Sequence, residues 1–206
     1  IWADRPELSK KPAFALGLEY AGESAADKLK RTREAMVAAG ANTYVLTTLD
    51  DICWTLNLRG DDIDYFPLLL SYAVIKMDSV EFYVDDSKLS EEIKADLVAL
   101  NVNIHPYNDI YEDVKAFGEE TVLLIDPDKL NYAIYNNFAA DVKKVEMQNP
   151  TILMKAIKNP VEVENIRKAQ IKDSVAHVRF MKWLKENVGK IRITEMSATD
   201  KLDEFR

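Results

Sequence analysis

The stretch Leu68-Leu-Leu-Ser-Tyr-Ala-Val-Ile-Lys-Met-Asp-Ser-Val-Glu-Phe-Tyr-Val84 contains two β-prone runs separated by a short polar turn. The first run reaches Ile75, and the second begins at Val80. Runs rich in Val, Ile, Tyr and Phe that are bounded by turn residues are typical of strands. Because so short a connection can join only antiparallel strands, this hairpin predicts at least one antiparallel pair in the sheet.

Helical and β-prone segments alternate on both sides of this hairpin. Helices are expected after the capping residues Ser24 and Ser90 and around Ile52. Strands are expected over residues 43–48, 102–107, 121–125 and 142–147, and further helices over 109–117 and 126–138. The alternation predicts an α/β fold with a mixed β-sheet and helices on both faces.

The apolar positions of these segments predict the core of one α/β domain between about residues 20 and 157. Its expected members are Leu29, Met36, Val45, Ile52, Leu56, Val74, Phe82, Leu97, Leu123 and Ile134. The single cysteine, Cys53, shares a helical face with Ile52 and Leu56 and is therefore expected to be a core thiol, not a nucleophile. A buried free thiol is typical of a reducing compartment, so we expect a cytoplasmic protein.

The N-terminal segment has no such periodicity. Residues 1–19 contain Pro6 and Pro12 and predict an extended inter-domain linker.

The C-terminal segment, residues 158–206, predicts two helices. Asn159-Pro-Val-Glu162 is a capping pattern that starts a helix to about Val188, and Thr194 starts a second helix that reaches Arg206. Apolar residues between Val175 and Leu184 surround most of the first helix, which is wider than one stripe. We therefore expect an incomplete domain whose apolar surface is covered by chain after Arg206 or by a second copy.

Charge and hydropathy exclude several classes of partner. Lys and Arg number 27 against 35 Asp and Glu in 206 residues, which gives a net charge of −8. A nucleic acid or an anionic membrane would be repelled on average, so neither is expected as a partner. The sequence contains no run of 18 apolar residues and no signal-peptide pattern, so no membrane segment is expected.

Few side chains stand in a catalytic pattern. The six glycines are isolated and form no phosphate-binding loop. His105 and His177 lack the spacing of metal ligands and are expected to be structural. Asp61, Asp62 and Asp64 fail the EF-hand spacing, which favours a solvated loop. We predict no catalytic residue and no metal ligand in this chain.

Asp126 and Asp128 flank a proline where a helix is expected to start. Carboxylates at a helix start satisfy free amides and the helix dipole, so capping explains both residues without catalysis.

Three motifs, in order along the chain, resemble Xaa-Pro aminopeptidases (aminopeptidase P) of the three-domain type within the creatinase/pita-bread metallopeptidase family. Leu49-Asp-Asp-Ile-Cys-Trp-Thr-Leu-Asn-Leu-Arg-Gly60, followed by Ser71-Tyr-Ala73, is similar to their second domain. Residues 158–176, 180–184 and 194–198 resemble the start of their catalytic domain. The chain departs from residues common in the family at Phe66, Asn165 and Gln170.

The N-terminal segment completes the resemblance. Trp2, Asp4-Arg-Pro6 and Leu18-Glu-Tyr-Ala-Gly22 resemble the junction after the first domain of these enzymes.

The resemblance implies a creatinase N-terminal-like domain over residues 20–157 and a truncated pita-bread domain over 158–206. It implies that the full-length protein uses two divalent metal ions, usually manganese, to remove an N-terminal residue that precedes proline. The family's metal ligands would all follow Arg206, so the resemblance assigns none to this chain.

The resemblance also implies a homodimer in which the noncatalytic domain shapes substrate access. Arg59 stands where a helix passes into a loop, and it is the candidate residue for the access route or the interface. The alternative is a surface arginine paired with Asp61 or Asp62.

Two other functions stay open. Histone-chaperone relatives keep the same architecture without metal ligands and bind peptides or proteins. A ribonuclease-like fold with magnesium at Asp61, Asp62 and Asp64 would instead predict metal binding and nuclease activity.

Overall fold

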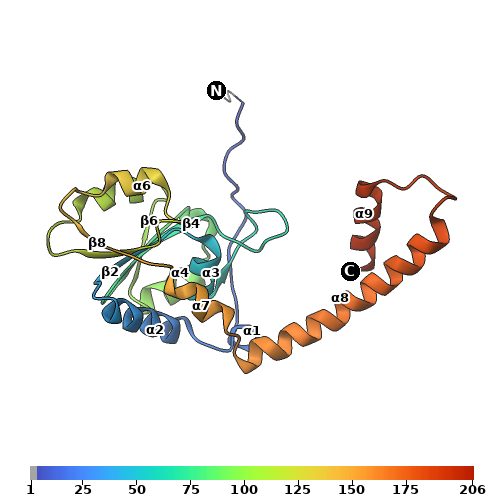
Figure 1. The fold of residues 1–206 in the computed structure, drawn as a ribbon, viewed down its shortest axis with the longest axis horizontal. Coiled ribbons are helices and arrows are strands. Elements are labelled where there is room, and N and C mark those ends of the chain that lie inside the picture. Colours follow the sequence, from blue (N-terminus) through green and yellow to red (C-terminus); the bar gives the residue numbers. More distant parts are fainter. Residues whose placement is uncertain (1–3) are drawn as a thin grey trace. The chain divides into compact units, whose positions relative to one another are not determined.

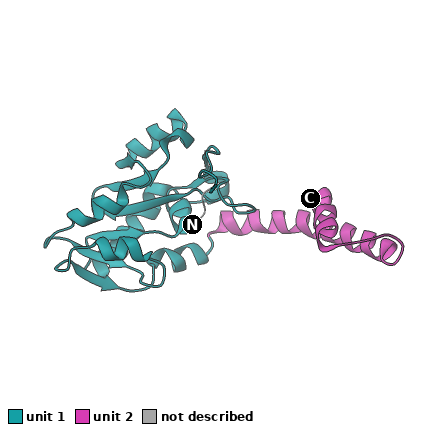
Figure 2. Ribbon diagram, turned by 90° about the horizontal axis from the view of Figure 1, so that it is seen from above, with its two compact units in different colours: residues 1–158 teal, residues 159–206 magenta. Residues whose placement is uncertain are grey.

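The computed structural model describes residues 4–206. Trp2, at the start of the predicted linker, lies outside the described residues. The chain forms two compact units: unit 1 ends at Lys158, and unit 2 runs from Asn159 to Arg206 (Figure 2).

Unit 1 is built on a six-stranded sheet in the order β6-β5-β4-β2-β7-β8. The strands are β2 (Thr43–Leu46), β4 (Ser71–Lys76), β5 (Val80–Val84), β6 (Val102–His105), β7 (Val122–Ile125) and β8 (Lys143–Glu146). Strand β4 is antiparallel to β2 and β5, whereas the other neighbouring pairs are parallel. The predicted mixed sheet is confirmed, and its hairpin is β4–β5.

Helices cover both faces of this sheet (Figure 1). The helices of the first face are α2 (Ala25–Ala38), α3 (Leu49–Thr55) and α4 (Glu91–Ala99), and those of the second are α5 (Ile110–Asp113) and α6 (Tyr132–Asn137). The remaining helical segments of unit 1 are α1 (Leu18–Ala21), α7 (Pro150–Ala156) and the 3₁₀ turns η1 (Asp86–Lys88) and η2 (Val114–Ala116). The predicted caps are present, because Ser24 and Ser90 accept hydrogen bonds from amides of the first turns of α2 and α4.

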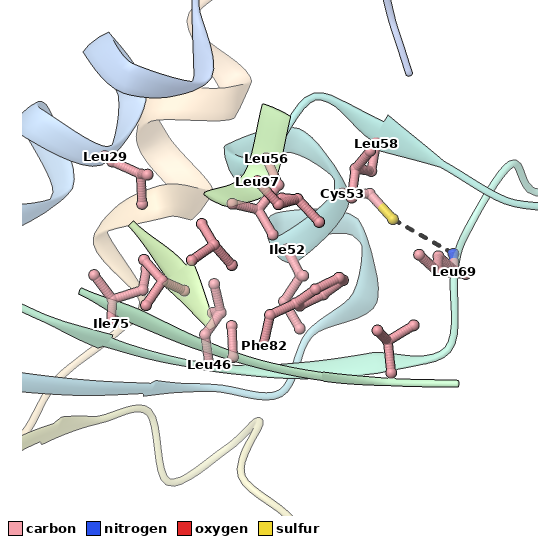
Figure 3. Close-up of a cluster of buried hydrophobic side chains, with 14 of the residues drawn as sticks. Leu29, Leu46, Ile52, Cys53, Leu56, Leu58, Leu69, Ile75, Phe82 and Leu97 are labelled. Atoms are coloured by element: carbon pink, nitrogen blue, oxygen red, sulfur yellow. Dashed lines mark hydrogen bonds between the residues drawn. The ribbon is translucent and has the colours of Figure 1, made fainter. Parts of the chain in front are cut away.

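The core consists of two clusters, one on each face of the sheet. All ten predicted core residues are buried, with exposed fractions between 0% and 5%. Leu46, Ile75 and Phe82 of the sheet contact the first cluster (Figure 3), and Val74 and Leu123 contact the second. Successive residues of β2, β4 and β7 alternate between the two clusters because side chains alternate across a sheet.

The second half of the predicted linker is not an extended tether but packs onto unit 1. Ala13 is buried in the first cluster, and β1 (Phe14–Ala15) pairs antiparallel with β3 (Leu58–Arg59). A two-residue strand has almost no sequence signal of its own and forms only because a distant partner is present.

The predicted helix start at Asp126 is wrong. Residues 126–130 form a turn, and α6 begins at Tyr132 with Asn131 as its N-cap. Asp126 instead accepts hydrogen bonds from the amides of Asp128, at 3.1 Å, and Asn149, at 2.9 Å. Its carboxylate therefore joins the end of β7 to the start of α7.

Unit 2 consists of α8 (Pro160–Asn187) and α9 (Glu195–Phe205). Capping boxes begin both helices, one between Asn159 and Glu162 and one between Thr194 and Ser197. Among the described helices, including the 28-residue α8, none has the apolar length that a membrane span requires.

Helix α9 covers part of the apolar surface of α8, for which the sequence indicates no partner inside the chain. Lys201 lies 5.9 Å from the centre of the Trp183 ring, and Arg206 pairs with Asp173 at 2.9 Å. Ala176 is buried, whereas Ile171 is 67% and Val178 is 70% exposed. Within the described residues, part of the surface between Val175 and Leu184 stays exposed, for example at Val178, and its cover by further chain or a second copy stays a prediction.

Candidate functional site

Arg59 lies in β3, directly after the short helix α3. Its guanidinium donates to the carbonyl oxygens of Cys53, at 2.9 Å, and Leu58, at 2.8 Å. The last carbonyls of a helix have no partner within the helix, so this guanidinium satisfies one of them and fixes the exit of the chain. Arg59 is therefore held against the start of the loop that follows.

That loop, residues 60–67, is pinned at its base by backbone hydrogen bonds. The amide of Gly60 donates to the carbonyl of Pro67 at 3.3 Å, and that of Asp62 donates to the carbonyl of Leu68 at 3.1 Å. At the tip, Tyr65 has a φ of 68° and is 89% exposed, and the neighbouring Phe66 is 61% exposed. A left-handed conformation is costly for a bulky residue, so the contacts at the base of the loop must offset this cost.

The base is closed by a buried ion pair. Lys88 of η1 places its Nζ 2.8 Å from Asp62 Oδ2, and the two side chains are 2% and 0% exposed. The same Oδ2 accepts from the amide of Leu70 at 2.7 Å. The prediction of a solvated acidic loop is therefore wrong for Asp62, whereas Asp61 is exposed and pairs with Lys11.

Gly60→Ala is expected to destabilise unit 1 by about 1–3 kcal/mol because an added methyl group overpacks this base. A Cβ at this position would lie 2.9 Å from the backbone oxygen of Leu68, and backbone cannot move aside as a flexible side chain can. Urea unfolding measures the effect. Gly118→Ala is the control, since nothing lies within 4 Å of its added Cβ. Equal effects of the two substitutions would contradict this account of Gly60.

Both histidines have carboxylate partners. His105 Nε2 lies 2.8 Å from Glu81 Oε2, and its ring stacks on Tyr83 with 5.1 Å between ring centres. His177 Nδ1 lies 3.2 Å from an Asp173 carboxylate oxygen, one turn earlier in α8. The sequence alone does not indicate Glu81 as the partner of His105, because their proximity depends on the parallel pairing of β5 and β6.

Glu81 is expected to make the stability of unit 1 acid-sensitive. Burial alone raises its pKa, but hydrogen bonds from His105, Asn103 and Lys76 lower the pKa to about 2, against an ordinary value of 4.5. A depressed carboxylate pKa contributes stability that is complete above the unfolded value and is lost as the pH falls toward the folded value. The difference in free energy of unfolding between the parent and Glu81→Gln should therefore shrink as the pH falls from 4.5 to about 2. A difference that stays constant over this range would contradict the prediction.

Cys53 is buried as predicted, with an exposed fraction of 2%. Its Sγ accepts from the amide of Leu69 at 3.4 Å (Figure 3), and burial raises the pKa of the thiol. A protonated, inaccessible thiol is a poor nucleophile, so the structure gives Cys53 a packing role.

Residues 4–206 bring together no group of three or more His, Cys, Asp or Glu side chains that could hold a metal ion. A dinuclear metal centre needs several carboxylates converging on two ions. The described residues therefore do not fit the two metal ions that the resemblance implies.

Comparison with known proteins identifies the family. Residues 4–162 match the family described as Creatinase/Prolidase N-terminal domain. The chain belongs to this family.

The individual relatives most similar to this chain include Xaa-Pro aminopeptidases. The chain is 34% identical to a probable Xaa-Pro aminopeptidase P of Neurospora crassa, over all of this chain and 32% of that protein. It is 35% identical to Xaa-Pro aminopeptidase 1 of Dictyostelium discoideum, over 98% of this chain and 32% of that protein. The resemblance to Xaa-Pro aminopeptidases is confirmed.

A solved structure agrees over the whole chain. The chain superposes on the X-prolyl aminopeptidase of Caenorhabditis elegans with a TM-score of 0.90 at 33% identity. The match covers 100% of this chain and 34% of that one. The Caenorhabditis elegans protein is described as a cytosolic enzyme with a di-nuclear active site. The chain thus spans about a third of the length of these relatives.

Proposed function

We propose that this chain is the noncatalytic middle domain, with the first helices of the catalytic domain, of a metal-dependent Xaa-Pro aminopeptidase. The full-length protein would remove an N-terminal residue that precedes proline. The observation that carries the proposal is the similarity over the whole chain to aminopeptidases of about three times its length. The two metal ions, which we expect to be manganese, would be held by residues outside this chain, because the described residues offer no ligand cluster.

The proposed role of unit 1 is to shape substrate access and to support a homodimer. Arg59 and the 60–67 loop support this role, since the guanidinium and the Asp62–Lys88 ion pair fix a loop that presents Tyr65 and Phe66 to solvent. Rigid exposed aromatic side chains are favoured at contact surfaces because they bury large area at little entropic cost. The expected partners are peptides with proline in second position and a second copy of the protein. The expected location of the protein is the cytoplasm. A nucleic acid is not expected, given the net charge of −8.

The proposed activity is tested on the longer protein with two tripeptides that differ only at position two. Proline removes the amide hydrogen and fixes φ, so a site shaped for it should reject alanine. We expect release of the first residue from the Xaa-Pro peptide and much slower release from the Xaa-Ala peptide. A longer protein that binds both peptides and cleaves neither would favour the peptide-binding, non-enzymatic alternative.

A further inference from the structure

A cavity of about 670 Å³ lies in unit 1, where strands β5 and β6 end. The two strands are parallel, so the residues that follow them, beginning at Asp85 and Pro106, meet at one edge of the sheet. Ligands of open α/β sheets bind outside the carboxyl ends of the strands. The volume lies within the range of about 300–1,000 Å³ that is usual for small-molecule sites.

Much of the cavity wall is apolar. Tyr107 is held in place because its ring stacks on Tyr72, with 5.0 Å between ring centres. The apolar and aromatic side chains that line the cavity are Leu8, Leu70, Val84, Ile104, Pro106 and Tyr107. Such a wall favours a ligand that carries apolar side chains.

Lys88 brings a buried ammonium group to the same cavity. Its side chain is 2% exposed, and among residues 4–206 its Nζ forms one hydrogen bond, to Asp62 Oδ2 at 2.8 Å. An ammonium group has three donors, and a buried donor without an acceptor is costly. An acceptor inside the cavity, such as a carboxylate, would therefore gain hydrogen bonds that Lys88 can still donate.

Two further side chains of opposite charge line the cavity. Lys94, with a side chain 29% exposed, lies 3.2 Å from Glu91 and 3.7 Å from Asp86. Asp85 Oδ1 accepts from the amide and the hydroxyl of Ser87, which lowers the pKa of this carboxyl group. Asp85 is therefore charged at neutral pH, and its Oδ2 can accept from another donor. The cavity thus combines two ammonium groups, a carboxylate and an apolar wall.

We propose that this cavity binds a zwitterionic peptide of two or three residues with apolar side chains. The peptide carboxylate would accept hydrogen bonds from Lys88 and Lys94, and the peptide ammonium would donate to Asp85. Because Lys88 is already paired with Asp62, it supplies hydrogen bonds, whereas Lys94 supplies the attracting charge. A single amino acid carries both charges but leaves much of a cavity of this volume unfilled. Any effect on peptide hydrolysis rests on the proposed function, but the binding does not.

The ligand is tested by titrating the isotope-labelled 206-residue chain with leucyl-leucine and following its amide chemical shifts. We expect saturable shifts at Leu70, Val84 and Asn108, which line the cavity, and unchanged amides in β8. Leucyl-leucine that is acetylated at its amine or amidated at its carboxylate should bind about tenfold more weakly or worse, because one charged hydrogen bond is lost. L-Leucine alone should also bind about tenfold more weakly or worse.

Substitutions connect the binding to named side chains. Lys94→Met and Asp85→Asn should each weaken the binding of leucyl-leucine by about tenfold, and the asparagine keeps an acceptor for Ser87. Lys115→Met is the matched control, because Lys115 also pairs with a glutamate three residues earlier, Glu112, but does not line the cavity. It should leave the affinity unchanged. The blocked dipeptides test the same contacts without any substitution, so the test does not depend on the folding of a variant.

The proposal is overturned if leucyl-leucine produces no saturable shifts at the cavity, or if the blocked dipeptides or L-leucine bind as tightly as leucyl-leucine does. It is also overturned if Lys94→Met binds leucyl-leucine as the parent does. This readout needs no turnover, so a negative result leaves the proposed aminopeptidase activity standing. An inactive longer protein would likewise leave this site standing.

Discussion

Lys88→Met is expected to lower the free energy of unfolding of unit 1 by about 3–5 kcal/mol, the range for removing one partner of a buried ion pair. The Lys88 and Asp62 side chains are 2% and 0% exposed, so water cannot replace the lost ammonium. Asp62 Oδ1 is already buried without a hydrogen-bond partner among the described residues. The variant would thus leave a carboxylate with a single amide donor, that of Leu70. Urea unfolding followed by circular dichroism measures the loss.

Two further variants test the physical reason for this loss. Lys94→Met should cost little, because its partners Asp86 and Glu91 are exposed and exposed pairs contribute little. Asp62→Asn in the Lys88→Met background should recover part of the loss, since it removes the buried charge and keeps an acceptor for Leu70. If Lys88→Met and Lys94→Met unfold at the same urea concentration, the ion pair does not close the base of the loop.

Leu123→Ala is expected to cost about 2–5 kcal/mol, the range for deleting a buried leucine side chain and leaving a cavity. Leu123 is fully buried in β7, which pairs with β2 on one side and β8 on the other. Neighbouring strands cannot collapse into the space without losing their own hydrogen bonds. Thermal and urea unfolding should agree on this loss.

Val98→Ala is the matched control for the core. Val98 is 68% exposed on α4, and alanine has the higher helix propensity, so the substitution should be neutral or slightly stabilising. A Leu123→Ala variant as stable as Val98→Ala would contradict the placement of the second core cluster.

Local patterns predicted most of unit 1. The hairpin β4–β5 follows from two β-prone runs and a short turn, and the caps at Ser24 and Ser90 follow from the preference of serine for helix starts. Such features depend on residues a few positions apart. The same holds for the capping box between Asn159 and Glu162, which begins α8.

Features that depend on distant partners could not be predicted in the same way. Asp62 stands in an acidic loop, and nothing nearby in sequence reveals that Lys88, 26 residues later, is buried beside it. Lys155 reaches Asp51 over 104 residues. Charged residues are exposed by default, so a buried pair is recognised only when the fold brings both partners together.

At the candidate site, too, the local feature could be predicted from the sequence and the distant contacts could not. The position of Arg59 after a helix was visible in the sequence, whereas the carbonyl of Cys53 as its acceptor was not. The sequence also allowed Arg59 to pair with Asp61 or Asp62. In the structure, Lys11 pairs with Asp61 and Lys88 pairs with Asp62.

The central claim, that this chain is a noncatalytic part of a metal-dependent Xaa-Pro aminopeptidase, is tested most directly by one paired measurement. Manganese content and release of the first residue from an Xaa-Pro tripeptide are determined on the 206-residue chain and on the longer protein that contains it. We expect no stoichiometric metal and no release with the 206-residue chain, and Mn²⁺-dependent release with the longer protein. Stoichiometric metal with turnover in the 206-residue chain, or an inert longer protein, would contradict the claim.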